Sequence, residues 1–354
     1  MRKILSTRRD VLLGLIAGSA LIARPSWAAP LDDVLAVPAV DLHSHAGGRL
    51  VSNKAQYNVA ERIVQGRFGT VTMAAIADLT VIRQASPGGP VKAYRTPAPG
   101  ECYASVGRQL DTIDNMISTG GFQRVLAPAD VAAAKAAGKA GLIVAVEGAD
   151  FLEGKLERVQ WAFERGVRHL QLVHYRVNEL GDIMTEDSVQ NGLTPFGAEV
   201  VRECNRLGII VDVAHATPET SAGIVKAAKA PIVMSHGGIT SEAPRRYSRM
   251  MTLDHAKGIV GTGGVIGMWP AGALFRSIDV WAGYLAKMTS LIGADHVGIG
   301  SDMEGGIDEV FNDYSAYPKV AEALLGKGLS VEQAGKIVGG NHARVFAAVA
   351  AAAG

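Results

Sequence analysis

Short apolar runs rich in valine and isoleucine recur along the chain and alternate with longer segments of helical periodicity. Such runs, bounded by glycine or proline, are typical of strands buried on both faces of a parallel sheet. The pattern predicts eight strands, near residues 39–43, 71–77, 142–147, 169–174, 209–215, 231–236, 264–268 and 297–302. The second segment also fits a helix, and that alternative stays open. Eight is the number of strands that closes a (β/α)8 barrel.

Helical patterns fall between these runs, among them residues 103–117, 128–137, 195–207, 218–228 and 278–291. Strand alternating with helix implies parallel pairing and right-handed crossovers. We therefore predict an α/β fold, a (β/α)8 TIM barrel that forms a single domain over residues 29–354. A segment rich in proline and glycine, residues 86–100, is predicted to be a surface loop over the barrel mouth. Asn341 is a candidate cap for a closing helix.

Residues 1–28 are predicted to be an export signal. Arg8-Arg9 precedes an apolar stretch from Val11 to Ala23, and Ser26-Trp27-Ala28 provides a cleavage site. This stretch is shorter than the roughly 20 apolar residues that a membrane-spanning helix requires. The arginine pair resembles a twin-arginine signal, and an ordinary secretory signal is the alternative. Both routes predict a location outside the cytoplasm, most simply a bacterial periplasm.

The charge balance changes when this segment is removed. Residues 1–28 hold five basic side chains and one acidic side chain, so their loss lowers the net charge from +1 to −3. The remaining chain has no basic run, which argues against nucleic acid or an anionic membrane as a partner. Cys102 and Cys204 lack the spacing of metal ligands, and we expect them to be unpaired. The sequence alone leaves a disulfide between them open.

Polar side chains at the ends of the predicted strands are the candidates for chemistry. Seven of them sit at such positions, namely His43, His45, Glu147, His174, His215, His236 and Asp302. The carboxyl ends of the strands form the active-site face of a barrel enzyme, so these side chains are expected to converge there. Four further histidines have no such placement and are expected to be structural: His169, His255, His296 and His342.

The histidines and the glutamate suit a metal centre. His43 and His45 are two residues apart in a strand, so both side chains can bind one ion, although an isolated His-x-His is more often packed or exposed. Glu147 ends a buried strand, where a carboxylate is costly unless a metal or an ion pair neutralises it. Its two oxygens can bridge two cations, with His215 and His236 binding the second. Two ions about 3.5–4 Å apart would activate a bridging hydroxide.

The remaining candidates suit catalysis and substrate binding. Asp302 is placed to take the proton of that hydroxide, and His174 to hydrogen-bond the developing oxyanion. The alternative for His174 is a core imidazole bonded to Asn178 or Asp182. The Asp41 carboxylate is expected to hydrogen-bond either to backbone groups or to the imidazole of a metal ligand.

Two arginines follow His236 in a predicted loop at the same face of the barrel. Arg245 or Arg246 is expected to clamp a substrate carboxylate with its planar guanidinium, and solvated surface charges are the alternative.

Together these motifs resemble the membrane dipeptidase (renal dipeptidase) family of zinc peptidases through nearly the whole mature chain. The motifs are Asp41-Leu-His43, Val146-Glu147-Gly148, Leu172-Val-His174, Val211-Asp-Val-Ala-His215, Ser235-His236 with Arg245-Arg246, Gly298-Ile-Gly-Ser-Asp302, and Gly340-Asn341 with Arg344-Val-Phe. The resemblance implies two Zn²⁺ ions bridged by Glu147, with His174 near the scissile carbonyl and Arg246 on the C-terminal carboxylate. It also implies a homodimer that hydrolyses L-L and L-D dipeptides.

The chain departs from the family in two places. The family usually has His-x-Asp at the first strand, whereas this chain has His43-x-His45, which makes the metal centre one charge more positive. We expect the hydroxide to form at lower pH as a result. The pocket tyrosine of the family has no clear counterpart after Gly263-Gly-Val. A related binuclear amide hydrolase, acting on a modified amino acid or a secondary-metabolite precursor, and a non-catalytic barrel that binds peptide or metal remain as alternatives.

Overall fold

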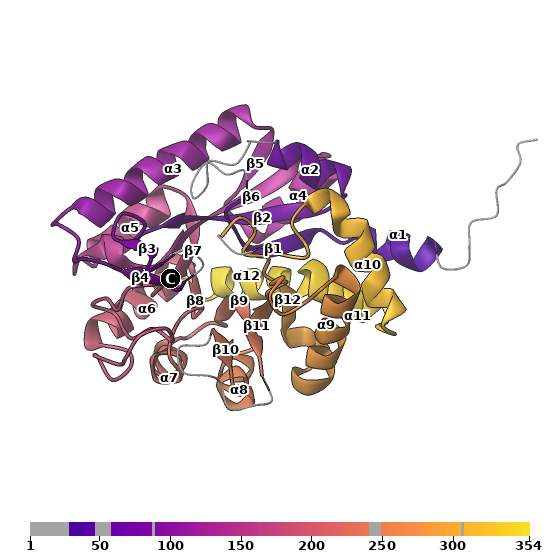
Figure 1. Cartoon of the computed structure of the whole chain (residues 1–354). Coiled ribbons are helices and arrows are strands. Elements are labelled where there is room, and N and C mark those ends of the chain that lie inside the picture. The colour runs from indigo at the N-terminus through magenta and orange to yellow at the C-terminus, as the bar shows by residue number, and fades with distance from the viewer. Residues whose placement is uncertain (1–27, 47–57, 87–88, 241–248, 306–307) are drawn as a thin grey trace, which may run out of the picture.

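Eight parallel strands close a barrel in the computed structural model, which describes residues 28–46, 58–86, 89–240, 249–305 and 308–354 (Figure 1). The strands are β1 (Ala39–Ser44), β2 (Gly69–Ile76), β6 (Ala140–Glu147), β7 (Val167–Gln171), β8 (Ile210–Asp212), β9 (Val233–Ile239), β11 (Val265–Met268) and β12 (Val297–Ile299). Their order is β9-β11-β12-β1-β2-β6-β7-β8, and pairing of β8 with β9 closes the ring. All eight predicted strands are confirmed, including the segment at 71–77 that also fitted a helix.

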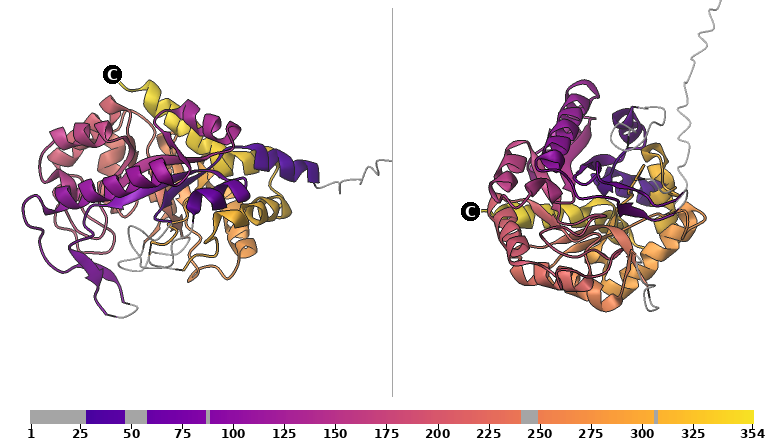
Figure 2. Two further views of the ribbon diagram at one scale, coloured as in Figure 1. Left: turned by 90° about the horizontal axis from the view of Figure 1, so that it is seen from above. Right: turned by 60° about the vertical axis from the view of Figure 1, so that its left-hand side comes forward.

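Helices surround the barrel, as the two further views in Figure 2 show. They are α1 (Ala28–Ala36), α2 (Val59–Gln65), α3 (Glu101–Thr119), α4 (Pro128–Ala136), α5 (Glu157–Glu164), α6 (Pro195–Leu207), α7 (Pro218–Ala227), α8 (Leu253–Gly261), α9 (Ile278–Ile292), α10 (Tyr317–Gly326), α11 (Val331–Gly335) and α12 (Asn341–Ala351). The five predicted helices are confirmed. Three of them begin where a hydroxyl side chain, Thr194, Thr217 or Ser277, accepts a hydrogen bond from a first-turn amide.

Four short strands were not predicted. β3 (Ile82–Gln84) and β4 (Val91–Ala93) form an antiparallel hairpin that projects from the barrel, while β5 (Phe122–Val125) pairs with β6 and β10 (Met250–Met251) pairs with β9 (Figure 2). β4 lies inside the segment predicted to be a loop over the barrel mouth. Residues of this hairpin do line the cavity at the mouth, so the predicted position is confirmed and part of the segment is strand.

The amino-terminal end of the barrel is closed by apolar packing. An inner cluster of buried residues joins strand residues such as Val40, Ile143 and Val233 to Val345 and Phe346 of α12. A larger cluster fills the space between the sheet and the outer helices. This apolar packing closes one end of the barrel and leaves the carboxyl ends of the strands as the open face.

The prediction that Asn341 caps a helix is wrong. A π-helical segment (Lys336–Gly340) leads directly into α12, so the amides at Asn341 lie inside a continuous helix and need no cap. The Asn341 amide instead donates to the carbonyl oxygens of Ala294, at 2.6 Å, and Val297, at 2.8 Å. Asn341 therefore anchors α12 to the start of β12.

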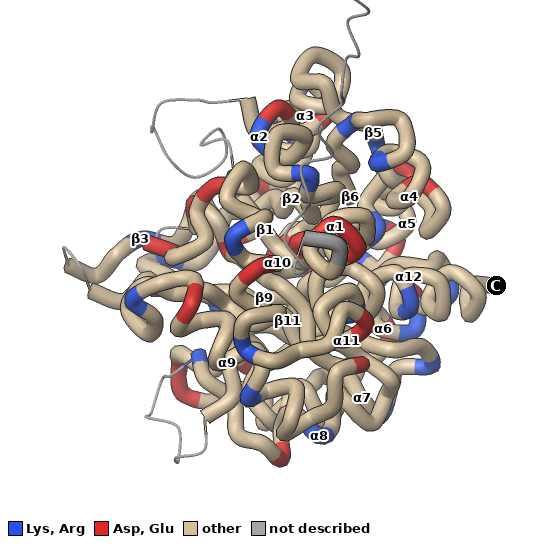
Figure 3. The backbone as a smooth tube through the Cα atoms, turned by 90° about the vertical axis from the view of Figure 1, so that its right-hand side faces the viewer, with Lys and Arg blue, Asp and Glu red and all other residues tan. Residues whose placement is uncertain are grey.

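The other general predictions concern cysteines, charge and membrane insertion. Cys102 and Cys204 are free and buried, as expected. Basic and acidic residues are interspersed on the side of the molecule drawn in Figure 3. None of the described helices has the length and apolar character that crossing a bilayer demands. Apart from Ala28, the predicted signal lies outside the described residues.

Candidate metal centre

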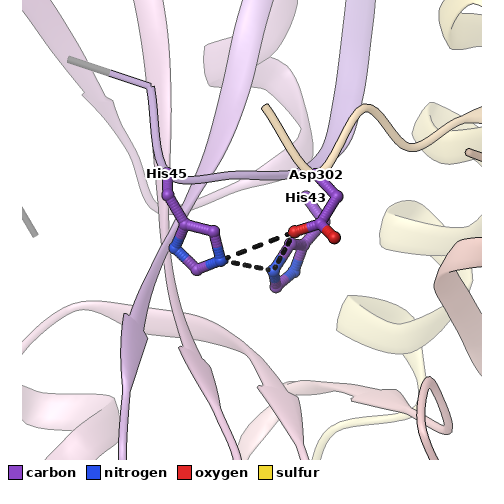
Figure 4. Close-up of side chains that lie close together, drawn as sticks. All are labelled: His43, His45 and Asp302. Carbon is purple, nitrogen blue, oxygen red and sulfur yellow. Dashed lines mark hydrogen bonds and ion pairs between the residues drawn. The ribbon is translucent and has the colours of Figure 1, made fainter. Parts of the chain in front are cut away.

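The seven predicted side chains come together at the carboxyl ends of the strands. They come from six different strand ends or the residues that follow them, and none is more than 5% exposed: His43, His45, Glu147, His174, His215, His236 and Asp302. Figure 4 shows three of them, with the rings of His43 and His45 turned toward Asp302. Residues up to 259 positions apart in sequence thus share one buried site.

Glu147 lies between two pairs of histidines. The Nε2 atoms of His43, His174, His215 and His236 lie 3.4, 3.4, 3.5 and 3.6 Å from Glu147 Oε1. The other oxygen, Oε2, lies 3.2 Å from Nε2 of His45. A carboxylate in this position can share its oxygens between two ions.

The spacing of the imidazole nitrogens fits metal coordination. The Nε2 atoms of His43 and His45 are 3.1 Å apart, and those of His215 and His236 are 3.2 Å apart. Two imidazole nitrogens bound to one tetrahedral zinc at about 2.0–2.1 Å would lie roughly 3.3 Å apart. Each histidine pair therefore fits one ion, and three overlapping groups of potential ligands lie within reach of a metal.

Two of the ligand imidazoles are oriented by hydrogen bonds on their far side. His45 Nδ1 lies 3.1 Å from the carbonyl oxygen of Ala74, which can only accept, so the ring proton sits on Nδ1 and the Nε2 lone pair faces the site. His236 Nδ1 lies 2.9 Å from the hydroxyl of Ser235. The Ala74 carbonyl fixes in His45 the tautomer that a metal ligand needs, whereas the Ser235 hydroxyl can donate or accept and therefore orients the His236 ring without fixing its tautomer.

The Asp41 carboxylate accepts hydrogen bonds from backbone amides, which is the first of the two roles expected for it. Its carboxylate accepts from the backbone amides of His43, at 3.3 Å, and Ser301, at 2.8 Å, and from the Tyr314 hydroxyl at 2.7 Å. Asp41 therefore ties the end of β1 to the end of β12 and sets the distance between His43 and Asp302.

Electrostatics within the cluster favour a bound cation. Burial alone would raise the pKa of Glu147, but the neighbouring His174 and His43 hold that pKa well below its usual value. Burial, together with the charge of Arg249, holds the pKa of His215 well below its usual value, and burial with His43 does the same to the pKa of His236. An ionised carboxylate beside the neutral imidazoles of His215 and His236 is a donor set that zinc binds. Burial lowers the pKa of His43, but Glu147 and Asp302 raise it above its usual value, so His43 must lose a proton to bind a metal ion.

Two site residues have an unusual backbone conformation. His215 and Asp302 have φ values of 66° and 53°, in the left-handed region that non-glycine residues rarely adopt. Such strain persists only where the surrounding structure enforces it, and it clusters at functional sites.

Asp302 Oδ1 lies 3.7 Å from His45 Nε2, and the Asp302 amide donates to the His43 carbonyl at 3.0 Å.

His174 is held by Asp78, a residue that the sequence analysis missed. The His174 Nδ1 lies 2.7 Å from Asp78 Oδ1, and Asp78 Oδ2 accepts from the Tyr175 amide at 3.0 Å. Burial opposes protonation, but Asp78 and Glu147 raise the pKa of His174 to about 9. The alternative that bonded this imidazole to Asn178 or Asp182 is wrong, because both side chains have other partners.

A cavity of about 710 Å³ opens above the cluster. Its wall includes Glu147, His174 and Asp302 together with Arg83 from the β3–β4 hairpin. A second arginine in this wall, Arg249, was also missed by the sequence analysis. The predicted carboxylate clamp, Arg245 or Arg246, lies outside the described residues.

Known proteins resemble the chain in sequence and in fold. A dipeptidase, tcpJ, from Claviceps purpurea (strain 20.1) is 31% identical over 217 residues, which make up 59% of this chain and 51% of that protein. The matched part thus spans about half the length of this relative.

Two solved structures share the barrel. An amidohydrolase from Pseudomonas aeruginosa superposes with a TM-score of 0.76 at 20% identity, over 90% of this chain and 98% of the other. A metallo peptidase from Rhodobacter sphaeroides, liganded with a phosphinate mimic of the dipeptide L-Ala-D-Ala, gives a TM-score of 0.71 at 22% identity, over 88% and 99% of the two chains. At these identities the superpositions establish the fold.

The sequence match to a family model completes the comparison. The model described as membrane dipeptidase (peptidase family M19) matches residues 38–354, which contain the complete barrel and all seven converging side chains. A match of this extent means that this chain belongs to the membrane dipeptidase family, peptidase family M19.

Proposed function

We propose that the chain is a zinc-dependent dipeptidase that binds two Zn²⁺ ions. The observation that carries the proposal is Glu147 between two histidine pairs, His43 with His45 and His215 with His236, in a buried site of the membrane dipeptidase fold. When bound, two zinc ions activate water and polarise the peptide carbonyl.

Two side chains of the protein have roles in the reaction itself. Asp302, at the edge of the cluster, accepts the proton of the attacking water and passes it to the amine that leaves. His174, whose raised pKa keeps it protonated at neutral pH, donates a hydrogen bond from Nε2 to the oxygen of the tetrahedral intermediate. Asp78 is a positioning residue, because it fixes the ring of His174 from the opposite side.

The substrate is proposed to be a free dipeptide with either an L- or a D-residue at its second position. The L-Ala-D-Ala mimic carried by the Rhodobacter sphaeroides metallo peptidase of this fold supports the second option. Arg246, as the family resemblance implies, or its neighbour Arg245 is proposed to bind the C-terminal carboxylate.

Activity against a panel of dipeptides tests the proposal. The wild-type protein should cleave L-L or L-D dipeptides and leave N-acetylated versions intact. Glu147→Gln should lose at least a hundredfold in kcat/KM together with bound zinc, whereas Glu157→Gln, an exposed change on α5, should match wild type. Equal cleavage of blocked and free substrates would favour the alternative amide hydrolase, and absence of any turnover would favour a binding protein.

We further propose that the protein is exported to the periplasm by the twin-arginine route and forms a homodimer. The Arg8-Arg9 pair before a short apolar stretch supports the route, and the family resemblance supports the dimer. Cell fractionation of an Arg8→Lys/Arg9→Lys variant tests the first, because the double change should retain the protein in the cytoplasm. Light scattering of the purified protein tests the second.

A further inference from the structure

Asp212 is a buried carboxylate that has no part in the mechanism proposed above. It is the last residue of β8 and is fully buried. Its Oδ1 accepts hydrogen bonds of 2.9 Å from the backbone amides of Ala214 and Ser235, and its Oδ2 lies 2.9 Å from Nε2 of His169. Because His169 lies on β7 and Ser235 on β9, Asp212 joins three neighbouring strands of the barrel.

The contacts of Asp212 keep it ionised. Burial alone would raise its pKa, but hydrogen bonding from the side chains of His169 and Ser235 and from the Ala214 amide holds that pKa below its usual value. An ionised carboxylate can only accept hydrogen bonds. His169 therefore donates from Nε2, and the sequence analysis, which left this histidine as structural, missed its link to Asp212.

Ser235 connects this carboxylate to a candidate metal ligand. Its hydroxyl oxygen lies 2.9 Å from Nδ1 of His236 and has a single proton to donate. If that proton goes to Nδ1, the imidazole carries its own proton on Nε2, the nitrogen that faces Glu147 at 3.6 Å. If the hydroxyl turns its proton toward Asp212, it accepts from Nδ1 and leaves the Nε2 lone pair free for a metal. The negative charge of Asp212 favours the second arrangement.

The second pair of histidines depends on this contact more than the first pair does. In the first pair, the Ala74 carbonyl fixes the tautomer of His45 directly. In the second pair, Nδ1 of His215 is buried and has no hydrogen-bond partner among the described residues. Ser235 is thus the one described partner that can hold a ring of the second pair from its far side, and the direction of its hydroxyl decides the tautomer.

We infer that Asp212, acting through Ser235, is a positioning residue that fixes His236 in the tautomer that binds the second zinc ion. This inference rests on the two-zinc site proposed above. Hydrogen-bond partners behind a ligand histidine typically contribute tenfold to a hundredfold to metal affinity. The affinity for one of the two ions should therefore depend on a carboxylate that touches neither the ion nor the substrate.

The tautomer can be measured in the metal-free protein. Nitrogen NMR of ¹⁵N-histidine-labelled protein distinguishes a protonated ring nitrogen from one with a free lone pair, and His236→Asn assigns the signals of this ring. Wild-type His236 should carry its proton on Nδ1. Asp212→Asn removes the charge that orients the Ser235 hydroxyl, so a larger fraction of His236 should carry the proton on Nε2.

Zinc binding provides the second readout. Competition with a chromogenic chelator should give two dissociation constants for the wild-type protein. Asp212→Asn should raise one of them by roughly tenfold to a hundredfold and leave the other unchanged. Crystals of this variant, equilibrated at a zinc concentration between its two constants, should then show anomalous density beside His43 and His45 alone.

Asp182→Asn is the matched control. Asp182 is also fully buried and accepts from a serine hydroxyl, that of Ser188, and from the backbone amides of Val189, Gln190 and Gly192. None of these hydrogen bonds involves an imidazole, so this variant should keep the wild-type tautomer and both zinc constants. Ser235→Ala should reproduce the loss seen in Asp212→Asn, and Ser235→Thr, which keeps a hydroxyl, should restore the affinity.

Several results would overturn the inference. They are a wild-type His236 protonated on Nε2, an unchanged tautomer in Asp212→Asn, and an equal loss of both zinc ions in that variant, which would indicate a general structural role. If Asp212→Asn does not fold, the two Ser235 variants decide the matter, because equal zinc affinity in both refutes the inference. A protein that binds two zinc ions as described but cleaves no dipeptide would refute the proposed function and leave the role of Asp212 supported.

Discussion

Replacing Asp78 by asparagine should slow catalysis without disturbing the metal cluster. Asp78 is fully buried and uses both carboxylate oxygens, one for His174 Nδ1 at 2.7 Å and one for the Tyr175 amide at 3.0 Å. Asparagine offers only one acceptor oxygen. Whichever way its amide turns, the variant loses either the contact to the imidazole or the contact to the backbone.

The size of the effect follows from the lost contact. A hydrogen bond to a charged group contributes about 1.5–3 kcal/mol, which corresponds to a roughly tenfold to 150-fold loss in rate. Since His174 is proposed to act on the transition state, kcat should fall while KM changes little. Asp78 helps to raise the pKa of His174 to about 9, so the basic limb of the pH–rate profile should move to lower pH in the variant.

Stability of the metal-free protein gives an independent readout. The pKa of His174 is about 9 in the folded protein and about 6.5 in the unfolded chain. Its contribution to the free energy of unfolding is therefore complete below about pH 6.5 and disappears as the pH rises through about 9. The difference in melting temperature between metal-free wild type and Asp78→Asn should therefore be largest near pH 6 and shrink toward pH 10.

Asp150→Asn is the matched control, because Asp150 is also buried but its carboxylate contacts Arg176 and Asn178 and not the ring of His174. It should preserve the basic limb of the pH–rate profile. If Asp78→Asn retains wild-type kcat and pH dependence, or if both variants lose kcat equally, the positioning role of Asp78 is refuted.

Two further predictions concern the metal site and the fold. His45→Asp should shift the acidic limb of the kcat/KM profile to higher pH, because a carboxylate makes the centre less positive, and an unchanged limb would contradict this. Lys135→Met should lower the free energy of unfolding by about 1–3 kcal/mol, as measured by urea titration, and leave kcat/KM unaltered. The Lys135 ammonium lies 2.7–3.1 Å from four backbone carbonyl oxygens, of Leu35, Val37, Arg67 and Phe68, far from the histidine cluster. A wild-type unfolding curve would contradict that role.

The barrel was predictable because most of its strands are short runs rich in apolar residues that end at or shortly before a polar side chain, such as Glu147 at the end of β6 and Asp302 after β12. The strand ends fix where side chains point, so the convergence of Glu147 with the histidines follows from topology alone. The β3–β4 hairpin was not predictable in this way, since Ile82–Gln84 has one apolar residue and its pairing depends on Val91–Ala93 across a turn.

The missed residues depend on contacts between distant segments. Asp78 lies two residues past the end of β2 and Glu147 is the last residue of β6, so the same strand-end rule would have found Asp78, but its partner His174 is 96 residues away. Arg249 is one of several arginines after His236, and only the pairing of β10 with β9 brings it into the cavity. Asn341 looked like a cap because the sequence does not reveal that the helix before it continues.

Anomalous diffraction at the zinc edge, from crystals of protein purified without chelators, tests the central claim most directly. We expect two zinc peaks per chain on opposite sides of Glu147, one beside His43 and His45 and the other beside His215 and His236. A single peak, no peak, or peaks away from Glu147 would contradict the binuclear centre.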